Sequence, residues 1–500
     1  MLYQAITTQH SQWFHPVALR MKRTIDRNPA LRLIILGVLN GAAHLLLWSP
    51  AITLFGASLA AIWMYGHING PLDWFAVEVL CVLALVAGWL SVQQYLTRPR
   101  QPEGIALDKQ QSPELFAMLE RRTGHFHTAP PHEVILTEEA KLTIHQVPRH
   151  VFPSGHKTIL TIGAPLLFFL SQDLFRLALA GVFAAHARKQ RGLQGWIIRC
   201  SEDLPLIIDA LQYRRSLATR LLAPLLQRLD TWNDTLGHEL RTELQQNAGR
   251  WVAEHIDEQQ AEQLLAGQVL ADLYLHRQYW PMIMKAADRC PAPVVKPFSH
   301  FKLLLDKILN RDTANRWLLQ AQTGSQGNHE LRDLLAGLGL DRLVWSGLPE
   351  QPASTHLLSS DILKALDHDW QTRIQSEWDE HHSRFQHDLK RFRQLQQQHS
   401  EQSLHGEPAM RYIQLAEQLV DSDELASICQ SVCDCNRNDA ALNFACGRQL
   451  IESGHARAGC EALQRAAELN QSLAHRAHAI INEQNCAWLN EDMNEHKARA

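Results

Sequence analysis

The sequence predicts a mainly α-helical protein with a small β-sheet, in which N-terminal transmembrane helices precede a helical domain and a C-terminal helical repeat. Three patterns predict this class. Residues 33–97 lack Lys and Arg and contain two long apolar stretches, β-branched runs suited to strands follow within residues 134–163, and apolar residues then recur mostly at helical spacing. A chain of 500 residues that is 46% hydrophobic has ample material for packed cores.

The two apolar stretches, Leu33–Tyr65 and Trp74–Leu96, are predicted to be transmembrane helices. About 20 apolar residues cross a hydrocarbon core of roughly 30 Å, so the second stretch makes one pass. The first stretch is longer and contains Pro50, so it is either one tilted, kinked span or a tight hairpin.

Charge around the two stretches favours two passes. Asp73 is the only charged residue of the connecting turn, whereas basic residues flank the pair on both outer sides. These flanking residues are Arg20, Lys22, Arg23, Arg27, Arg32, Arg98 and Arg100. Because basic flanks remain in the cytoplasm, we expect a multi-pass protein of the inner (cytoplasmic) membrane with a cytoplasmic soluble domain. The lipid bilayer is then one partner, and a formal net charge of −4 together with the absence of a recognisable motif predicts no nucleic-acid partner.

Short strands and a helix follow the second stretch. Ser112 before Pro113 predicts a helix start, with Ser as the cap and Pro at the first helical position. Apolar residues from Leu174 to Gln190 recur at helical spacing, which predicts a helix with one buried face. The expected strands are Val134–Leu136, Leu142–Val147 and Lys157–Gly163.

The C-terminal part is predicted to be helical throughout. Apolar residues at three- and four-residue steps predict a long amphipathic helix from Trp370 to about Gln398. The segment around Gly447, Gly454 and Gly459 then resembles a tetratricopeptide repeat, with small residues at the two packing positions and a Gly at the turn. A generic helical hairpin without a peptide groove remains the alternative.

The helices before this repeat, about Glu407 to Cys435, match the pattern less well. Because a repeat stack needs about three units, we expect the tail to depend on neighbouring parts of the protein. The cysteines Cys429, Cys433 and Cys435 lie in this part, and the first two would share a helix face. No second CxxC or His pair completes four ligands, so we predict no metal there.

The most informative residues run from Ile159 to Gln190. A β-branched strand leads through Gly163-Ala164-Pro165-Leu166 into a helix that ends Val182-Phe183-Ala184-Ala185-His186-Ala187-Arg188-Lys189-Gln190. This order resembles the membrane zinc metallopeptidases of the HtpX and CAAX prenyl endopeptidase type, which are gluzincin-like. In that family a strand and a similar turn lead into a helix that reads VLAHELGH.

The resemblance implies a zinc motif that is broken in this chain. In HExxH, two His residues four apart bind zinc from one helix face, and the Glu activates the zinc-bound water as a general base. His186 matches the first ligand, Ala187 occupies the general-base position, and Gln190 occupies the position of the second His. The family's third ligand lies in a later pattern like EFQAD, where Glu243 matches the ligand and Asn247 replaces an Asp that supports the zinc ligands from outside the metal's own shell.

The resemblance extends over roughly residues 30 to 345, because the segment Asn328–Gly339 is similar to THPSLRDRLAALG in larger bacterial members. Together with the apolar stretches and the helical patterns, it divides the chain into five expected parts. These are a basic cytoplasmic N-terminus at 1–32, transmembrane helices at 33–96, a metallopeptidase-like domain at 105–345, a helical connector at 346–400, and a tetratricopeptide-like tail at 406–500.

Two functions follow from the broken motif. The first is a catalytically inert pseudo-peptidase that needs no cofactor and holds polypeptide or membrane-protein partners as a scaffold. The second is an active zinc metalloendopeptidase of membrane protein quality control with an atypical site. Other His-Glu pairs, His132-Glu133 and His238-Glu239, lack a second His at the required step and offer no replacement for the motif.

Overall fold

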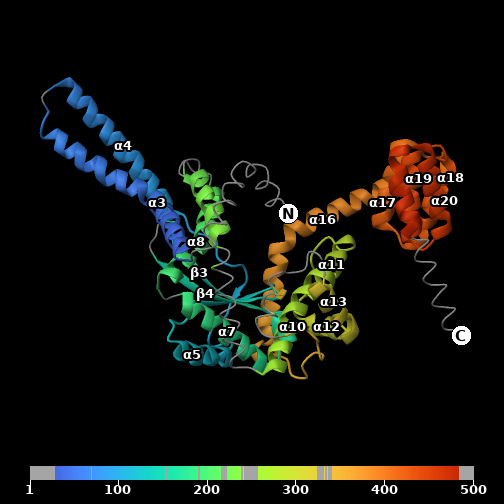
Figure 1. Ribbon diagram of the computed structural model, residues 1–500, viewed down its shortest axis with the longest axis horizontal. Helices are drawn as coiled ribbons and strands as arrows, with labels where there is room; N and C mark the ends of the chain where they lie inside the picture. Colours follow the sequence, from blue (N-terminus) through green and yellow to red (C-terminus); the bar gives the residue numbers. More distant parts are fainter. Residues whose placement is uncertain are drawn as a thin grey trace. The chain divides into compact units, whose positions relative to one another are not determined.

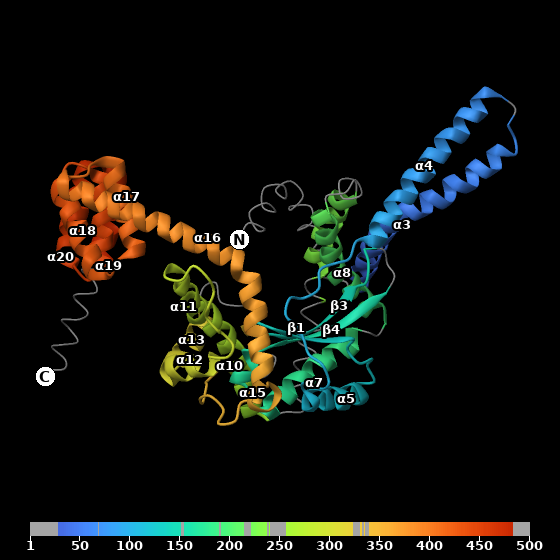
Figure 2. The same cartoon turned by 180° about the vertical axis from the view of Figure 1, so that it is seen from behind.

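The computed structural model of the chain confirms the predicted class, which is mainly α-helical with one small sheet. The described residues form two compact units, which are drawn in Figures 1 and 2. The first unit comprises Met1–Ile283 and Val295–Arg373, and the second comprises Met284–Val294 and Ile374–Ala500. The structure describes residues 29–68, 70–151, 155–189, 192–214, 222–237, 240, 257–323, 331–332, 335 and 340–483.

A hairpin of two apolar helices begins the first unit (Figure 1). Helix α3 (Pro29–Tyr65) continues through Pro50, so the first apolar stretch is one helix rather than a tight hairpin. Proline has no N–H to donate to the carbonyl of Leu46, and the Ser49 hydroxyl donates to that oxygen at 2.7 Å instead. Helix α4 (Pro71–Leu96) begins where the Gly70 amide donates to the Asp73 carboxylate at 3.0 Å.

Both helices are long and apolar enough to cross a membrane, which indicates membrane association. Trp74 and Tyr95 lie near opposite ends of α4 and are separated by roughly 31 Å of helix, close to the thickness of a hydrocarbon core. Both side chains are more than half exposed, as expected for aromatic residues at the two membrane interfaces. Tyr65 contacts Trp74 at the tip of the hairpin, with 6.1 Å between ring centroids.

The first part of α3 belongs to the core of the first unit. Leu36 packs with Ile197 and Leu236, and Leu47 packs with Leu204 and Leu226. These partners lie on helix α8 (Gly192–Arg214) and on the helical segment 222–237. The first apolar stretch exceeds one membrane span because its first part is a packed element of this unit.

A four-stranded sheet lies beside these helices (Figure 2). The three predicted strands are confirmed as β2 (Glu133–Thr137), β3 (Leu142–Pro148) and β4 (His156–Gly163). A fourth strand, β1 (Ile105–Ala106), was not predicted because two residues carry no alternating pattern. The order is β1-β2-β4-β3, with β2 and β4 parallel and the two outer pairs antiparallel.

Gly163 ends β4 at a point where no side chain fits. A Cβ atom there would lie 1.9 Å from the carbonyl oxygen of Glu139 and 2.8 Å from the amide nitrogen of Lys141. The turn between β2 and β3 is fixed against this residue, because the Gly163 amide donates to the Lys141 carbonyl. The turn Gly163-Ala164-Pro165-Leu166, which leads from β4 to the next helix, therefore begins at a position that requires glycine.

We expect Gly163→Ala to lower the free energy of unfolding by about 3 kcal/mol, because two backbone segments must separate to admit the methyl group. The measurement is the thermal melting of the detergent-purified protein. Gly124→Ala is the matched control, since nothing lies within 4 Å of a Cβ atom at that position in a helix. Its stability should be unchanged or higher by up to about 1 kcal/mol. Equal melting of the two variants would contradict the close approach at Gly163.

Helices cover the sheet and continue the first unit. Helix α5 (Pro113–Phe126) begins where predicted, but the Ser112 hydroxyl donates to the Leu357 carbonyl at 3.3 Å instead of capping its own helix. Helix α7 (Gln172–Lys189) confirms the predicted helix with one buried face. Helix α11 (Trp280–Met284) ends at the boundary of the first unit, and η2 (Lys285–Asp288) belongs to the second unit. The other elements of the first unit are α6 (Leu166–Phe169), α10 (Glu258–Tyr274), η1 (Leu275–Tyr279), α12 (Phe301–Ile308), α13 (Arg311–Thr323) and α15 (Ala353–Leu357).

The long helix α16 (Ser360–Glu401) begins ten residues before the predicted start at Trp370. The earlier turns are helical because Ile362 and Leu366 are buried, whereas the prediction relied on the polar stretch that starts later. Four helices of the second unit follow α16, and a further helical segment, 471–483, comes after them. The four are α17 (Gly406–Leu419), α18 (Ser422–Cys435), α19 (Ala440–Glu452) and α20 (Ala456–Leu469).

The pair α19 and α20 has the close contact that the glycine positions predict. A Cβ atom on Gly447 would lie 2.9 Å from the Gly459 carbonyl oxygen, and one on Gly459 would lie 2.7 Å from the Gly447 oxygen. Gly454 occupies the turn with φ of +85°, a conformation that favours glycine. The helical segment 471–483 packs on this pair through Ala477, and this contact was not predicted.

Candidate functional site

The predicted site lies at the end of α7. The helix starts where the Leu174 amide donates to the Ser171 hydroxyl at 3.3 Å. Phe175, Leu179 and Phe183 then form a buried face at helical spacing, and His186 continues that face with only 3% of its surface exposed. The residue that matches the first zinc ligand is therefore directed into the protein by the same pattern that builds the core.

Ala187 is the next residue of α7 and is partly exposed. A zinc hydrolase of the HExxH type needs a carboxylate here to take a proton from the metal-bound water. A methyl group accepts no proton, and the described end of α7 reads Ala184-Ala185-His186-Ala187-Arg188-Lys189, without any acid. The residues present on this helix therefore do not fit a catalytic zinc.

The remaining residues of the predicted site lie outside the part of the chain that the structure describes. These are Gln190, Glu243 and Asn247, together with the pair His238-Glu239. Within the described ranges, no group of three or more His, Cys, Asp or Glu side chains is arranged to hold a metal ion. In the second unit Cys429 and Cys433 share the buried side of α18 as predicted, whereas Cys435 is exposed.

Strand β3 forms one edge of the sheet close to α7. It pairs with β4 along seven residues, and within the described ranges no other strand pairs with its outer side. Helices α7 and α8 both pack against it. An edge strand offers backbone N–H and C=O groups that can bind an extended polypeptide.

A polar pair of the exposed His156 and the buried Asp203 joins β4 to α8, and no sequence motif pointed to it. The Nε2 atom of His156 lies 2.6 Å from Oδ2 of Asp203, while Oδ1 of Asp203 is buried without a hydrogen-bond partner among the described residues. Burial raises the pKa of the Asp203 carboxyl, and the hydrogen bond with His156 acts in the opposite direction. The pair therefore fixes the start of β4 against α8.

Cys200 lies one turn before Asp203 on α8, and its Sγ atom is 3.8 Å from Nε2 of His44. Burial raises the pKa of its thiol to about 12, and the nearby Asp203 carboxylate adds to this effect. A raised pKa disfavours the thiolate that nucleophilic chemistry requires.

No family model matches this chain, and comparisons with curated proteins and with solved structures give no significant match. The fold and site define a helical protein with a small mixed sheet and a hairpin of two helices able to span a membrane. The metallopeptidase resemblance rests on the motifs at residues 159–190, 243–247 and 328–339.

Proposed function

We propose that this chain is a membrane-anchored, non-catalytic relative of the zinc metallopeptidases that holds polypeptides or membrane proteins as a scaffold. The observation that carries the proposal is Ala187, which follows the buried His186 on α7 and provides no general base. Losing a positioned general base alone typically reduces a rate by roughly 10²- to 10⁴-fold. The strand, turn and helix that would hold such a site are nevertheless retained, which favours a binding role over a catalytic one.

Two features support polypeptide binding. The outer side of β3 has no strand partner within the described ranges, and an added strand from a partner would continue the sheet there. In the second unit, the close packing of Gly447 against Gly459 supports a tetratricopeptide-like helix pair, an architecture that serves as an extended binding surface in repeat proteins.

Metal analysis of the full-length protein, purified in detergent, tests the loss of catalysis. We expect far less than one zinc ion per chain and no casein cleavage that a chelator inhibits. His186→Ala should leave both results unchanged, because His186 then has no metal to hold. Casein that binds to the protein without being cleaved would support the scaffold.

The opposite outcome identifies the alternative function. Stoichiometric zinc with chelator-sensitive proteolysis that disappears in His186→Ala would show an active metalloendopeptidase with an atypical site. A protein that neither cleaves nor binds unfolded polypeptide would contradict both functions.

The orientation in the membrane is a separate prediction. Arg98 and Arg100 follow α4, and basic residues also precede α3. Both outer flanks of the hairpin are therefore expected on the cytoplasmic side of the inner membrane. A cytoplasmic reporter fused after Arg100 or at Ala500 should be active, and a periplasmic reporter at the same positions should be silent. A periplasmic signal at both positions would reverse the proposed orientation.

A further inference from the structure

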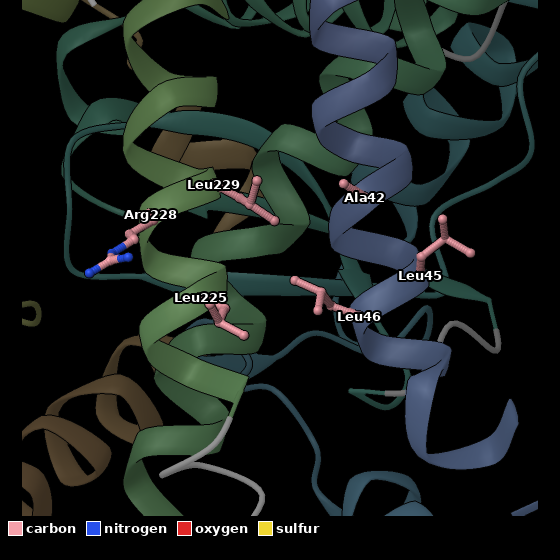
Figure 3. Close-up of a pocket in the computed structure, with 6 residues that line it drawn as sticks. All are labelled: Ala42, Leu45, Leu46, Leu225, Arg228 and Leu229. Carbon is pink, nitrogen blue, oxygen red and sulfur yellow. The ribbon is translucent and has the colours of Figure 1, made fainter. Parts of the chain in front are cut away.

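A groove of about 520 Å³ lies between α3 and the helical segment 222–237. Figure 3 shows Leu46 and Leu229 in the space between the two helices, with Arg228 on the side of the segment that faces away from α3. The groove is lined by Ala42, Leu45, Leu46, Leu225, Arg228 and Leu229. Arg228 is thus the single charged side chain among the described residues that line an otherwise apolar surface.

The packing of the two helices fixes the groove on both sides of its lining residues. Asn40 and Asn233 are almost fully buried and exchange hydrogen bonds, with amide nitrogen to amide oxygen distances of 3.2 and 3.3 Å. On the N-terminal side of Asn40 along α3, Leu36 packs with Leu236. On its C-terminal side, Leu47 shares a cluster with Leu226. The helices therefore run antiparallel in a fixed register, because the buried amides satisfy each other only in this alignment.

The groove lies at the level where α4 would leave the hydrocarbon core. Tyr65 contacts Trp74 at the tip of the hairpin, and a Cβ atom on Gly88 would touch Leu54 at 3.5 Å. Counting along two antiparallel helices from these contacts sets Tyr95 beside about residues 44 to 47 of α3. These positions coincide with the groove, and the membrane-interface residue Tyr95 is close to Arg98 in sequence.

The chemistry of the groove favours a phospholipid over other ligands. Leu45 is 64% exposed beside it, and the exposed side of α3 continues through Trp48 and Ile52 along the membrane-spanning part. Arg228 is exposed at the edge of this surface. A guanidinium group binds phosphate oxygens in a bidentate manner, and the leucines suit an acyl chain. A polypeptide backbone would instead leave polar groups without partners against the leucines.

We infer that this groove binds one glycerophospholipid, with an acyl chain along the leucines and the phosphate at the rim of the groove, where the Arg228 guanidinium would turn from the outer side of the segment 222–237 to hold it. The inference rests on the membrane anchoring in the proposed function, but it does not depend on the loss of catalysis. A bound lipid would fill the space between α3 and the segment 222–237 and hold this part of the first unit at the bilayer surface.

Native mass spectrometry of the full-length protein, purified in detergent and titrated with phosphatidylglycerol, tests the inference. We expect one tightly retained lipid per chain, because the groove is lined by a single charged side chain that can hold a phosphate. Arg228→Ala should weaken binding about tenfold, since a charge-assisted contact is lost. Ala42→Phe should abolish binding by filling the groove without removing a packed side chain.

Two matched controls accompany these variants. Arg393→Ala removes an exposed guanidinium from α16, and Ala51→Phe adds the same ring to α3 beyond the groove. Both should bind phosphatidylglycerol as the wild type does. Equal binding by all variants would show only non-specific lipid and would overturn the inference. A dimer that Ala42→Phe dissociates would also overturn it, because a second chain would then occupy the groove.

Membrane fractionation separates this result from the proposed function. If the protein is released from membranes by alkaline carbonate, the anchoring itself is wrong and the lipid site falls with it. If the protein remains in the membrane but shows no groove-dependent lipid binding, the lipid site alone is wrong.

Discussion

Changing Ala187 to Glu and Gln190 to His together is expected to raise the zinc content of the purified protein from far below one to about one ion per chain. The double change restores the HExxH pattern, in which two imidazoles four residues apart lie on one helix face. Helix α7 is continuous through Lys189, so the first half of the motif already has the required helical frame. Glu243 supplies the third ligand in the family pattern, and its contribution to zinc binding rests on the resemblance.

The single changes separate the two losses. Gln190→His alone should already increase zinc binding, because it restores the second imidazole, whereas Ala187→Glu alone should not. Adding His186→Ala to the double change should remove the metal again. Turnover is expected to remain low even in the double variant, because Asn247 still replaces the carboxylate that orients a zinc ligand in the family pattern.

Zinc content must be compared with thermal melting to interpret a negative result. A double variant that melts like the wild type and yet binds no zinc would show that the three positions do not converge. That outcome would remove the metallopeptidase relationship from the proposed function and leave only the membrane-anchored scaffold.

Local patterns predicted most of the regular elements. Strand β4 was predicted from its β-branched run, and the structure buries it from Thr158 onward, as is typical of a central strand. Pro50 left the first apolar stretch ambiguous, since a sequence does not reveal that the Ser49 hydroxyl would bond the carbonyl that proline leaves without a donor. The first turns of α16 were missed because their helical state follows from tertiary burial of Ile362 and Leu366.

The candidate site could be predicted only in part. His186 and Ala187 are found on the helix that the motif indicated, while Gln190, Glu243 and Asn247 lie outside the described residues. The Asn40–Asn233 pair joins residues 193 positions apart in the chain. No periodicity or motif identifies such a contact, so the groove beside it could be found only from the packing of α3 on the segment 222–237.

The tail helices are expected to need the second half of α16 for folding. Phe392 and Leu395 of α16 are buried in the same cluster as Tyr412 and Val432 of the tail, and the rings of Phe392 and Tyr412 stack with centroids 5.4 Å apart. The Nε2 atom of His399 also lies 2.9 Å from the Ser431 hydroxyl. The cluster is therefore incomplete in any fragment that begins after α16.

A fragment of residues 406–500 should consequently show no cooperative melting transition, whereas residues 374–500 should melt cooperatively. Circular dichroism of both fragments during heating provides the measurement. In the full-length protein, Phe392→Ala should destabilise the second unit by about 3–5 kcal/mol, as expected for a buried ring. Lys390→Ala is the control, because this neighbouring side chain on α16 is exposed and its removal should change stability by less than about 0.5 kcal/mol. Cooperative melting of the shorter fragment would show that the helices from α17 onward form a self-sufficient core and that the contacts of Phe392 are dispensable.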